Sequence, residues 1–248
     1  MKGVILAGDS GSKLYPLTLG IPKQLLPIYN KPMIYYPIET LVEVGVLDIL
    51  IITSPEQIQS FVKALGDGSK FGARFTYATQ NTPEGAVQAF SIGEEFISND
   101  SVCFITGDCI IWGDDKAAKL IKAIRAANNS GYSTIFVYMD CDKEQYGVAR
   151  LNKNGECEAI EGMVKDTLHY SITGLYVFPK GVSDYAKVID KSERGRYEIV
   201  TLNQVYLNEN KLRVQILGKD FRWFDTNSFD SLQEVSNYLQ KKYITKKQ

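Results

Sequence analysis

The sequence predicts a single α/β domain in which helices flank a mixed, mainly parallel sheet. Short apolar runs rich in valine and isoleucine recur along the chain, and a longer amphipathic stretch follows each of them. The runs are continuously hydrophobic instead of alternating, which predicts strands buried on both faces, as in parallel sheets. Right-handed crossovers between such strands would place helices on both faces. The length of 248 residues is enough for a substantial core.

The hydrophobic periodicity places strands and helices in alternating order. The clearest expected strands of the first half are Gly3–Ala7, Ile49–Thr53, Val102–Thr106 and Thr134–Met139. The helical patterns that lie between them are Met33–Val44, Glu56–Leu65, Glu84–Ile97 and Asp115–Ala127. From about Tyr146 the expected strands are shorter and more polar, which predicts a partly antiparallel addition at Gly147–Leu151, Cys157–Ile160 and Ile172–Phe178. A last helix is expected around Leu232, Val235 and Leu239, which fall at i, i+3 and i+7.

The composition excludes several classes of protein. The 28 basic and 29 acidic residues nearly cancel, so no global field would attract nucleic acid or an anionic membrane. The cysteines lie in or beside apolar runs without paired metal spacing, and no amino-terminal stretch has the pattern of a signal peptide. No apolar run approaches the roughly 20 residues that span a bilayer. We therefore expect a cytoplasmic protein with free thiols, no nucleic-acid partner and no membrane segment.

A run of small residues, GDSGSKLYP at 8–16, follows the first expected strand. Small residues let backbone amides approach a ligand, and Lys13 adds a cation, a combination that suits phosphate. An ordinary turn at the end of a strand fits the same residues, so both interpretations stay open on this loop alone. The spacing matches neither the G-x-x-x-x-G-K-S/T of a P-loop nor the G-x-G-x-x-G of a dinucleotide fold, which disfavours those two classes.

Two further segments carry a family resemblance: residues 22–28 read PKQLLPI, and residues 31–36 read KPMIYY. With the first loop, they resemble the sugar nucleotidyltransferase family, most closely its short-form glucose-1-phosphate thymidylyltransferases. The further matching pieces occur in family order over nearly the whole chain: Leu65–Ser69, Gln80, Gly85 with 88–90, Gly107–Asp108, Gln145–Val148, Thr173–Tyr176 and Trp223–Thr226. So many ordered matches make the resemblance specific.

The resemblance implies one nucleotide-diphospho-sugar transferase-like, Rossmann-like domain over residues 1–248. Within it, 1–140 would form the nucleotide-binding part, 141–230 the sugar-binding part and 231–248 a C-terminal helix and tail. It also implies a reaction in which a sugar 1-phosphate, expected to be glucose 1-phosphate, attacks the α-phosphorus of a nucleoside triphosphate, expected to be dTTP, and releases pyrophosphate. This chemistry serves nucleotide-sugar and surface-polysaccharide biosynthesis. Relatives of this kind are usually homo-oligomers, so an assembly is expected by analogy.

The resemblance also assigns roles to matching positions. Lys23 would be the principal cation at the reacting phosphates, Lys13 a second one at the leaving pyrophosphate, and Asp108 a further catalytic residue. Asp108 and Asp225 would hold Mg²⁺, a hard ion that prefers oxygen ligands, although Asp108 also fits an ordinary turn aspartate. The nucleotide-binding residues would be Leu6, Ala7, Gly8, Ser10, Gly11, Gln24, Gln80 and Gly85, with the two glutamines near the base. The sugar-binding residues would be Gly107, Tyr146, Gly147, Glu161, Thr173, Gly174 and Tyr176.

The sequence departs from the family pattern at several of these positions. The family loop G-G-x-G-T/S-R-L has Asp9 in place of its second glycine and Lys13 in place of its arginine. Asp9 would repel a triphosphate unless it turns away or binds a metal, and lysine lacks the two-pronged geometry of arginine. The family's Lys-Pro after Glu161 is Gly-Met at 162–163 here, with Lys165 as the nearest substitute for a phosphate-binding lysine. These changes favour a second hypothesis, a non-catalytic or weakly active paralogue that binds nucleotide or sugar in a regulatory or scaffolding role.

Overall fold

The computed structural model describes residues 1–113, 116–139, 147–161, 170–224 and 226–245. The strands are β1 (Lys2–Leu6), β2 (Pro27–Ile28), β3 (Lys31–Pro32), β4 (Asp48–Thr53), β5 (Arg74–Thr79), β6 (Val102–Thr106), β7 (Ile110–Gly113), β8 (Ser133–Met139), β9 (Val148–Leu151), β10 (Cys157–Glu161), β11 (Tyr170–Phe178), β12 (Leu212–Leu217) and β13 (Phe221–Phe224). The α-helices are α1 (Tyr35–Glu43), α2 (Ile58–Leu65), α3 (Gln88–Ile92), α4 (Glu94–Ile97), α5 (Lys116–Ser130), α6 (Val182–Lys187), α7 (Ile199–Asn208) and α8 (Phe229–Thr245). Single 3₁₀ turns are formed by Ser12–Leu14, Lys23–Leu25 and Ser69–Phe71.

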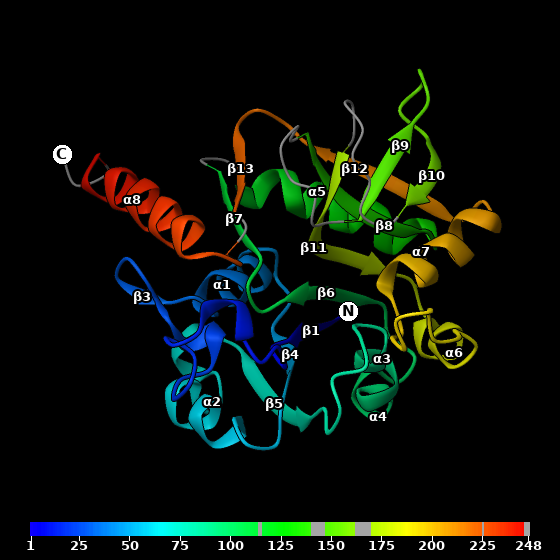
Figure 1. Ribbon diagram of the computed structural model, residues 1–248. Coiled ribbons are helices and arrows are strands. Elements are labelled where there is room, and N and C mark those ends of the chain that lie inside the picture. Colours follow the sequence, from blue (N-terminus) through cyan, green and yellow to red (C-terminus); the bar gives the residue numbers. More distant parts are fainter. Residues whose placement is uncertain (114–115, 140–146, 162–169, 225, 246–248) are drawn as a thin grey trace.

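A nine-stranded mixed sheet forms the centre of the molecule, and helices cover both of its faces, which confirms the predicted fold class (Figure 1). Hydrogen-bonded neighbours follow the order β10-β9-β11-β6-β1-β4-β5, and β8 pairs with both β11 and β12. The strands β6, β1, β4 and β5 are mutually parallel, and β12 is parallel to β8. In this sheet β11 is antiparallel to β6, β8 and β9, and β10 is antiparallel to β9. Every antiparallel pair of the sheet thus contains a strand that follows Tyr146, where the sequence predicted a partly antiparallel addition.

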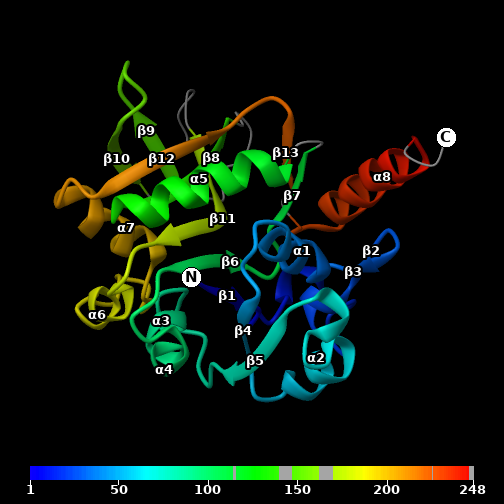
Figure 2. The same cartoon turned by 180° about the vertical axis from the view of Figure 1, so that it is seen from behind.

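Alternate residues of the central strands face two separate cores. Ile5 of β1 lies in the core that packs under α1, α2 and α5, whereas Val4 lies in the core with α3, α6 and α7. Figure 1 and Figure 2 show the two opposite sides of the molecule, with α5 lying along the strands in the second view. Five of the six residues of β4 are buried, which agrees with its continuous hydrophobic run.

A third, smaller core holds α8 against the first half of the chain. Val235 and Leu239 are fully buried against Ile28, Tyr36 and Phe224, so the predicted last helix is confirmed and its apolar stripe is the packed face. This helix is 17 residues long and lies at one edge of the molecule, beside β2 and β3 (Figure 1).

One expected helix differs from the structure. The pattern Glu84–Ile97 contains two short helices, α3 and α4, and the helical conformation begins only at Gln88. Gly93 separates the two helices, and Gly85 has a φ of 123°, which is outside any helical conformation. The chain before α3 instead pairs with the segment around Tyr197, whose N–H donates to Glu84 O at 2.6 Å. Tertiary pairing therefore replaces the first turn of the predicted helix.

Candidate active site

Several of the predicted site residues lie at the carboxyl ends of β1 and β6. These strands are parallel neighbours, with Leu6 opposite Thr106, and Gly107 N–H donates to Leu6 O at 2.8 Å. A side chain on Gly107 would meet the Ala7 and Gln24 side chains at 3.0 Å, so glycine allows the two strand ends and the 3₁₀ turn at Lys23–Leu25 to pack closely. Ligands of open α/β sheets bind at this edge.

Lys23 lies at the centre of this site and is only 1% exposed. Its Nζ is 2.6 Å from Asp108 Oδ2, 2.6 Å from Asn227 Oδ1 and 3.7 Å from Asp9 Oδ2. Burial acts to raise the pKa of the Asp108 carboxyl, but the charge of Lys23 and the hydrogen bonds from Lys23 and Thr106 outweigh it and hold that pKa below its usual range. The buried ammonium is thus neutralised by oxygen atoms of the protein itself.

The carboxylate of Asp9 turns back into its own loop. Its Oδ1 accepts a hydrogen bond from the Gly11 N–H at 3.1 Å, while its Oδ2 faces Lys23. Gly11 has a φ of 67° and lies against Thr18 and the Lys23 side chain, and Thr18 donates its hydroxyl to Gly11 O at 2.7 Å. One backbone amide of the loop expected to bind phosphate is therefore occupied by Asp9.

Two glutamines with buried side chains lie beside this loop. Gln80 is 3% exposed, and its Nε2 donates to Gly85 O at 3.1 Å and to Gln88 Oε1 at 2.5 Å. A methyl group on Gly8 would meet Gln80 Oε1 at 2.8 Å, so that oxygen faces the loop. Gln24 is 1% exposed, and its buried Oε1 has no hydrogen-bond donor in the described part of the chain. Each glutamine thus presents a carbonyl oxygen.

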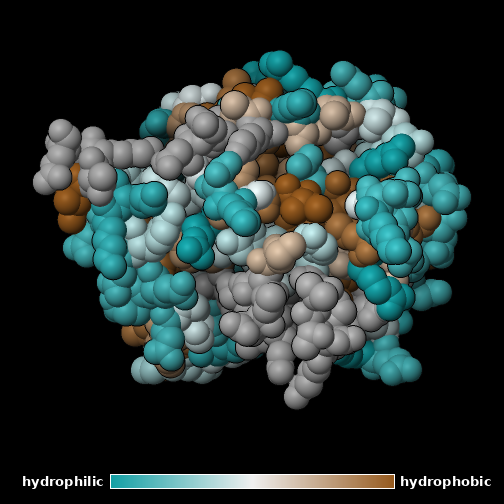
Figure 3. Space-filling view, turned by 90° about the horizontal axis from the view of Figure 1, so that it is seen from above, coloured by the Kyte–Doolittle hydropathy of each residue, from teal (hydrophilic) through white to brown (hydrophobic). Residues whose placement is uncertain are grey.

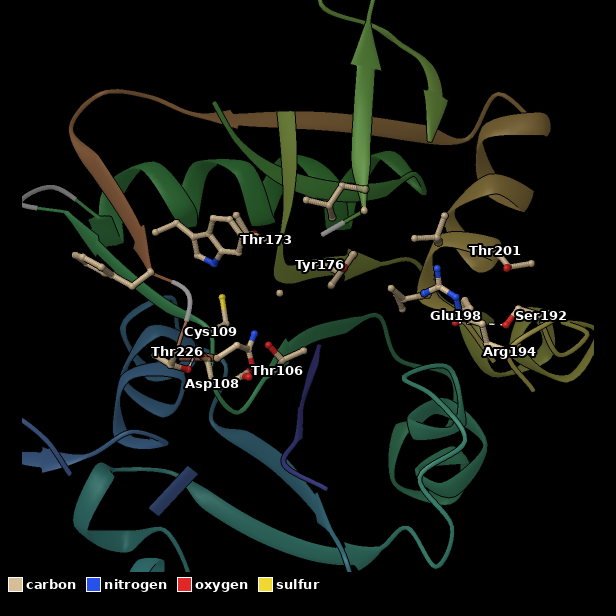
Figure 4. A pocket seen from close by; sticks show the side chains of 18 of the residues that line it. Thr106, Asp108, Cys109, Thr173, Tyr176, Ser192, Arg194, Glu198, Thr201 and Thr226 are labelled. Atoms are coloured by element: carbon tan, nitrogen blue, oxygen red, sulfur yellow. Dashed lines mark hydrogen bonds between the residues drawn. The ribbon is translucent and has the colours of Figure 1, made fainter. Parts of the chain in front are cut away.

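A cavity of about 560 Å³ lies next to the Lys23 cluster. Thr106, Asp108, Cys109 and Thr226 lie on one side of it, and the labelled residues Ser192, Arg194, Glu198 and Thr201 lie on the other (Figure 4). Its apolar lining consists of Ile172, Ile199, Val200, Trp223 and Phe224 together with Tyr176. The space-filling view shows hydrophobic residues gathered in a hollow near the middle of one face, with hydrophilic residues on both sides (Figure 3).

Strand β11 forms the back of the cavity through an irregularity in its pairing. Its register against β8 shifts between Ile172 and Tyr176, and a side chain on Gly174 would collide with Thr106 Oγ1. Thr173 donates its hydroxyl to Phe136 O at 2.9 Å, which holds the shifted segment on β8. Burial raises the pKa of the Tyr176 phenol, so this side chain is a neutral part of the wall.

The match to a family model decides the identity of the fold. Residues 2–242 match the model described as nucleotidyl transferase. The chain belongs to the nucleotidyl transferase family. A glucose-1-phosphate thymidylyltransferase of Neisseria meningitidis is 46% identical to it over 97% of this chain and 83% of that protein. One of Mycolicibacterium smegmatis is 43% identical over 97% of this chain and 82% of that protein.

Solved structures agree with this nucleotidyl transferase fold. A Bacillus anthracis protein designated a glucose-1-phosphate thymidylyltransferase and crystallised with sucrose is 33% identical, has a TM-score of 0.87 and covers 96% of this chain and 94% of that one. A UDP-glucose pyrophosphorylase in complex with UDP-glucose is 21% identical with a TM-score of 0.80 over 97% of this chain and 98% of that one, and it shares the fold. The family resemblance predicted from the sequence is confirmed.

In this nucleotidyl transferase, the predicted site residues fall into three groups. The residues that line the cavity are Asp108, Gly147, Thr173, Gly174 and Tyr176. The residues of the adjoining strand end, loop and turns are Leu6, Ala7, Gly8, Gly11, Lys23, Gln24, Gln80, Gly85 and Gly107, while Ser10 and Lys13 are exposed in the same loop. The positions outside the described residues are Tyr146, Gly162, Lys165 and Asp225, and nothing is described of the Glu161 side chain.

Most of the residues that line the cavity were not among the sequence-based candidates, and Arg194, Glu198 and Trp223 are three of them. Arg194 is the one cation among the described residues that line the cavity. It lies in a turn closed by the bonds Ser192 N–H to Arg196 O and Gly195 N–H to Ser192 O, both 2.8 Å long. The signal that could have found it is the Ser-Glu-Arg-Gly turn a few residues before α7, because a polar surface turn exposes its middle side chains.

Two absences concern the described residues alone. No helix among them is long and apolar enough to cross a membrane. They also contain no group of three or more histidine, cysteine, aspartate or glutamate residues arranged to hold a metal ion.

Proposed function

We propose that the protein is a sugar-1-phosphate nucleotidyltransferase that joins dTTP to glucose 1-phosphate and releases pyrophosphate. The observation that carries the proposal is the position of the buried Lys23–Asp108 pair at the carboxyl ends of β1 and β6, directly beside the cavity that contains Arg194. The relatives that match nearly the whole chain bear the name of this activity, which favours an enzyme over a non-catalytic paralogue.

The described residues support an in-line transfer. A phosphate oxygen of the sugar 1-phosphate forms a bond to the α-phosphorus, and the bond from that phosphorus to the bridging oxygen of pyrophosphate breaks. The nucleophile is already an anion, so no general base is required, and the protein has to bring two anions together and neutralise them. Lys23 would exchange its bonds to protein oxygens for phosphate oxygens, and the Arg194 guanidinium would bind the sugar phosphate with paired hydrogen bonds.

Recognition of the base follows from the amide of Gln80. Both hydrogens of its Nε2 are used within the protein, by Gly85 O and Gln88 Oε1, so the group left for a ligand is the Oε1 acceptor. Thymine and uracil present a ring N–H donor on their recognition edge, whereas cytosine has an unprotonated ring nitrogen there. The orientation of this amide supports a thymine or uracil nucleotide.

Mg²⁺ remains a prediction that the donor set supports. The oxygens of Asp9, Asp108 and Asn227 around Lys23 Nζ are all hard ligands, and the two carboxylates outweigh one ammonium. Asp108 and Asp225 would hold the ion, which would offset the charge of the phosphates. A cytoplasmic location and a homo-oligomeric assembly also remain predictions, supported by the absence of a membrane-spanning helix among the described residues and by the symmetry usual for soluble enzymes.

The test is a pyrophosphate-release assay with Mg²⁺ and panels of nucleoside triphosphates and sugar 1-phosphates. We expect release with dTTP and glucose 1-phosphate, and a loss of at least about 100-fold in Lys23→Met because the charge-neutralising cation is removed. Lys31→Met is the matched control, since Lys31 also pairs with a carboxylate, Glu39, at 2.5 Å but lies outside the site. Absence of release with every pair, together with a nucleotide-induced rise in Tm, would favour the non-catalytic paralogue.

A further inference from the structure

A chain of side-chain hydrogen bonds leads from the surface to the amide of Gln80. Lys191 Nζ donates to Glu84 Oε1 at 2.6 Å, and Gln88 Nε2 donates to the other oxygen, Glu84 Oε2, at 3.0 Å. Gln88 Oε1 in turn accepts from Glu84 N–H at 3.0 Å and from Gln80 Nε2 at 2.5 Å. Two glutamines and one glutamate are thereby joined in a fixed order.

This order is determined by chemistry at both ends. A carboxylate can only accept, so the group that Gln88 turns toward the Glu84 carboxylate must be its NH₂. A backbone N–H can only donate, so the group that Gln88 turns toward the Glu84 N–H must be its carbonyl oxygen. The Gln88 carbonyl then requires a donor from Gln80, and Gly85 O requires one too. The Gln80 amide therefore has one allowed orientation, because its hydrogen-bond partners decide which terminal atom is the nitrogen and which is the oxygen.

Glu84 is itself held by the segment that carries Arg194. Tyr197 N–H donates to Glu84 O at 2.6 Å, and Val87 N–H donates to Tyr197 O at 3.3 Å. A side chain on Gly85 would collide with the Tyr197 backbone, so these two segments are in direct contact. The backbone position of Glu84, and with it the direction of its carboxylate, is set by this pairing.

We propose that Gln88, oriented by Glu84, is a positioning residue that sets the base preference of the enzyme by fixing the amide of Gln80. The inference rests on the proposed function and deepens it at the base. Without the Gln88 acceptor, Gly85 O is the remaining partner of Gln80 Nε2, so the Gln80 amide turns over more readily and presents its NH₂, which pairs with the unprotonated ring nitrogen of cytosine. With the acceptor in place, Gln80 Oε1 faces the unprotonated ring nitrogen of cytosine. Two acceptors then oppose each other, an arrangement that weakens binding strongly.

The experiment measures dTTP and dCTP on the full chain with Mg²⁺, both as Kd by calorimetry and as kcat/KM. Wild type is expected to prefer dTTP. In Gln88→Met, which is nearly isosteric, the dTTP to dCTP ratio should fall about tenfold, the effect of one buried hydrogen-bonding group. Gln233→Leu is the control, because it removes a comparable amide bond, Gln233 Nε2 to Asn237 Oδ1, on α8 away from the site.

A reciprocal exchange separates orientation from general damage. In Glu84→Gln with Gln88→Glu, the new glutamine donates to the new carboxylate and still offers Lys191 an acceptor, while the new carboxylate accepts from Gln80 Nε2. The dTTP to dCTP ratio should therefore return to within about threefold of wild type. If Gln88→Met does not fold, Glu84→Met provides a weaker form of the same test. It removes the carboxylate but keeps the backbone N–H, one of the two groups that fix the Gln88 amide, so the ratio should fall by a smaller factor in the same direction.

A fall in affinity that is equal for both nucleotides, leaving their ratio unchanged, would overturn the inference, as would failure of the exchange to restore the ratio. The binding measurement keeps this outcome distinct from the proposed function. Suppose that the wild type binds dTTP more tightly than dCTP and that the ratio responds as described, but no pyrophosphate is released. The positioning role of Gln88 then stands and the enzymatic proposal fails.

Discussion

Asp9 provides the sharpest test of how charge controls nucleotide binding here. Asp9→Asn keeps an oxygen that accepts the Gly11 N–H and removes only the negative charge that faces Lys23. A phosphate that binds the same Gly11 amide has to approach the position now held by the carboxylate, so the two anions would lie about 4 Å apart or less. We therefore expect the neutral variant to bind nucleotide more tightly than the wild type.

The size of the effect follows from Coulomb's law and exposure. Two unit charges 4 Å apart repel by about 1 kcal/mol in water and by about 4 kcal/mol at an effective dielectric constant of about 20. The Asp9 side chain is 54% exposed, so an intermediate repulsion of about 2 kcal/mol is appropriate. Every 1.4 kcal/mol is a factor of ten in affinity, so Asp9→Asn should lower the Kd for dTTP about 30-fold.

Calorimetric titration of dTTP at two salt concentrations, in the presence and absence of Mg²⁺, measures this gain. Because the repulsion is electrostatic and partly exposed, the gain should shrink at high salt. Asp67→Asn is the matched control, since Asp67 Oδ1 accepts from Ser69 N–H at 3.0 Å in the same local geometry on the turn after α2. A Kd for Asp9→Asn within about twofold of wild type at low salt would refute the charge argument.

Two further predictions concern stability. Gly85→Ala should lower the free energy of unfolding by about 2 kcal/mol or more, because the φ of 123° is strained for alanine and its methyl group would collide with the Tyr197 backbone. Gly20→Ala is the control, since its methyl group meets open space and its stability should stay near that of the wild type. Equal losses for the two variants in urea unfolding would contradict this prediction. Burial opposes ionisation of Asp108, yet Lys23 holds its pKa below the usual range, so its stabilising contribution is present above about pH 4 and is lost as the pH falls further. The Tm of wild type should therefore fall more steeply than that of Asp108→Asn in thermal scans from about pH 5.5 to about pH 3, and parallel curves would show that the pair contributes nothing.

Strands buried on both faces could be predicted from the sequence, whereas two of the edge strands, β5 and β12, were not. β4 and β6 are continuous apolar runs whose neighbours all lie in the core, so local composition is enough to identify them. β5 and β12 lie at edges of the sheet with exposed residues along their length, which dilutes the hydrophobic signal. The pairing of β13 with β7 joins segments about a hundred residues apart in the chain, and such long-range pairing has no local pattern.

The family motifs located Lys23 and Asp108 at the site, but not the burial of Lys23. An isolated lysine in a sequence is most simply a surface residue, because its charge is costly to bury without a partner. Its partners Asp108 and Asn227 are 85 and 204 positions away in the chain, so only the folded structure shows that they meet. The sequence assigned no role to Arg194 or Gln88 for a related reason, since the position of Arg194 at the cavity and the bond of Gln88 to Gln80 exist only in the folded structure.

The same geometry indicates how a carboxylate is tolerated in a loop that is expected to bind phosphate. Lys23 is buried, and a buried ammonium needs anionic or polar oxygens around it. Asp108 and Asn227 contact it directly, while Asp9, more than half exposed and at 3.7 Å, contributes the weakest of the three interactions. A phosphate would therefore displace Asp9 first, and the cost is the repulsion of about 2 kcal/mol that the partly exposed carboxylate still exerts. Asp108 stays beside Lys23. The aspartate at position 9, where the family has glycine, would therefore weaken nucleotide binding without removing the cation on which the proposed reaction depends.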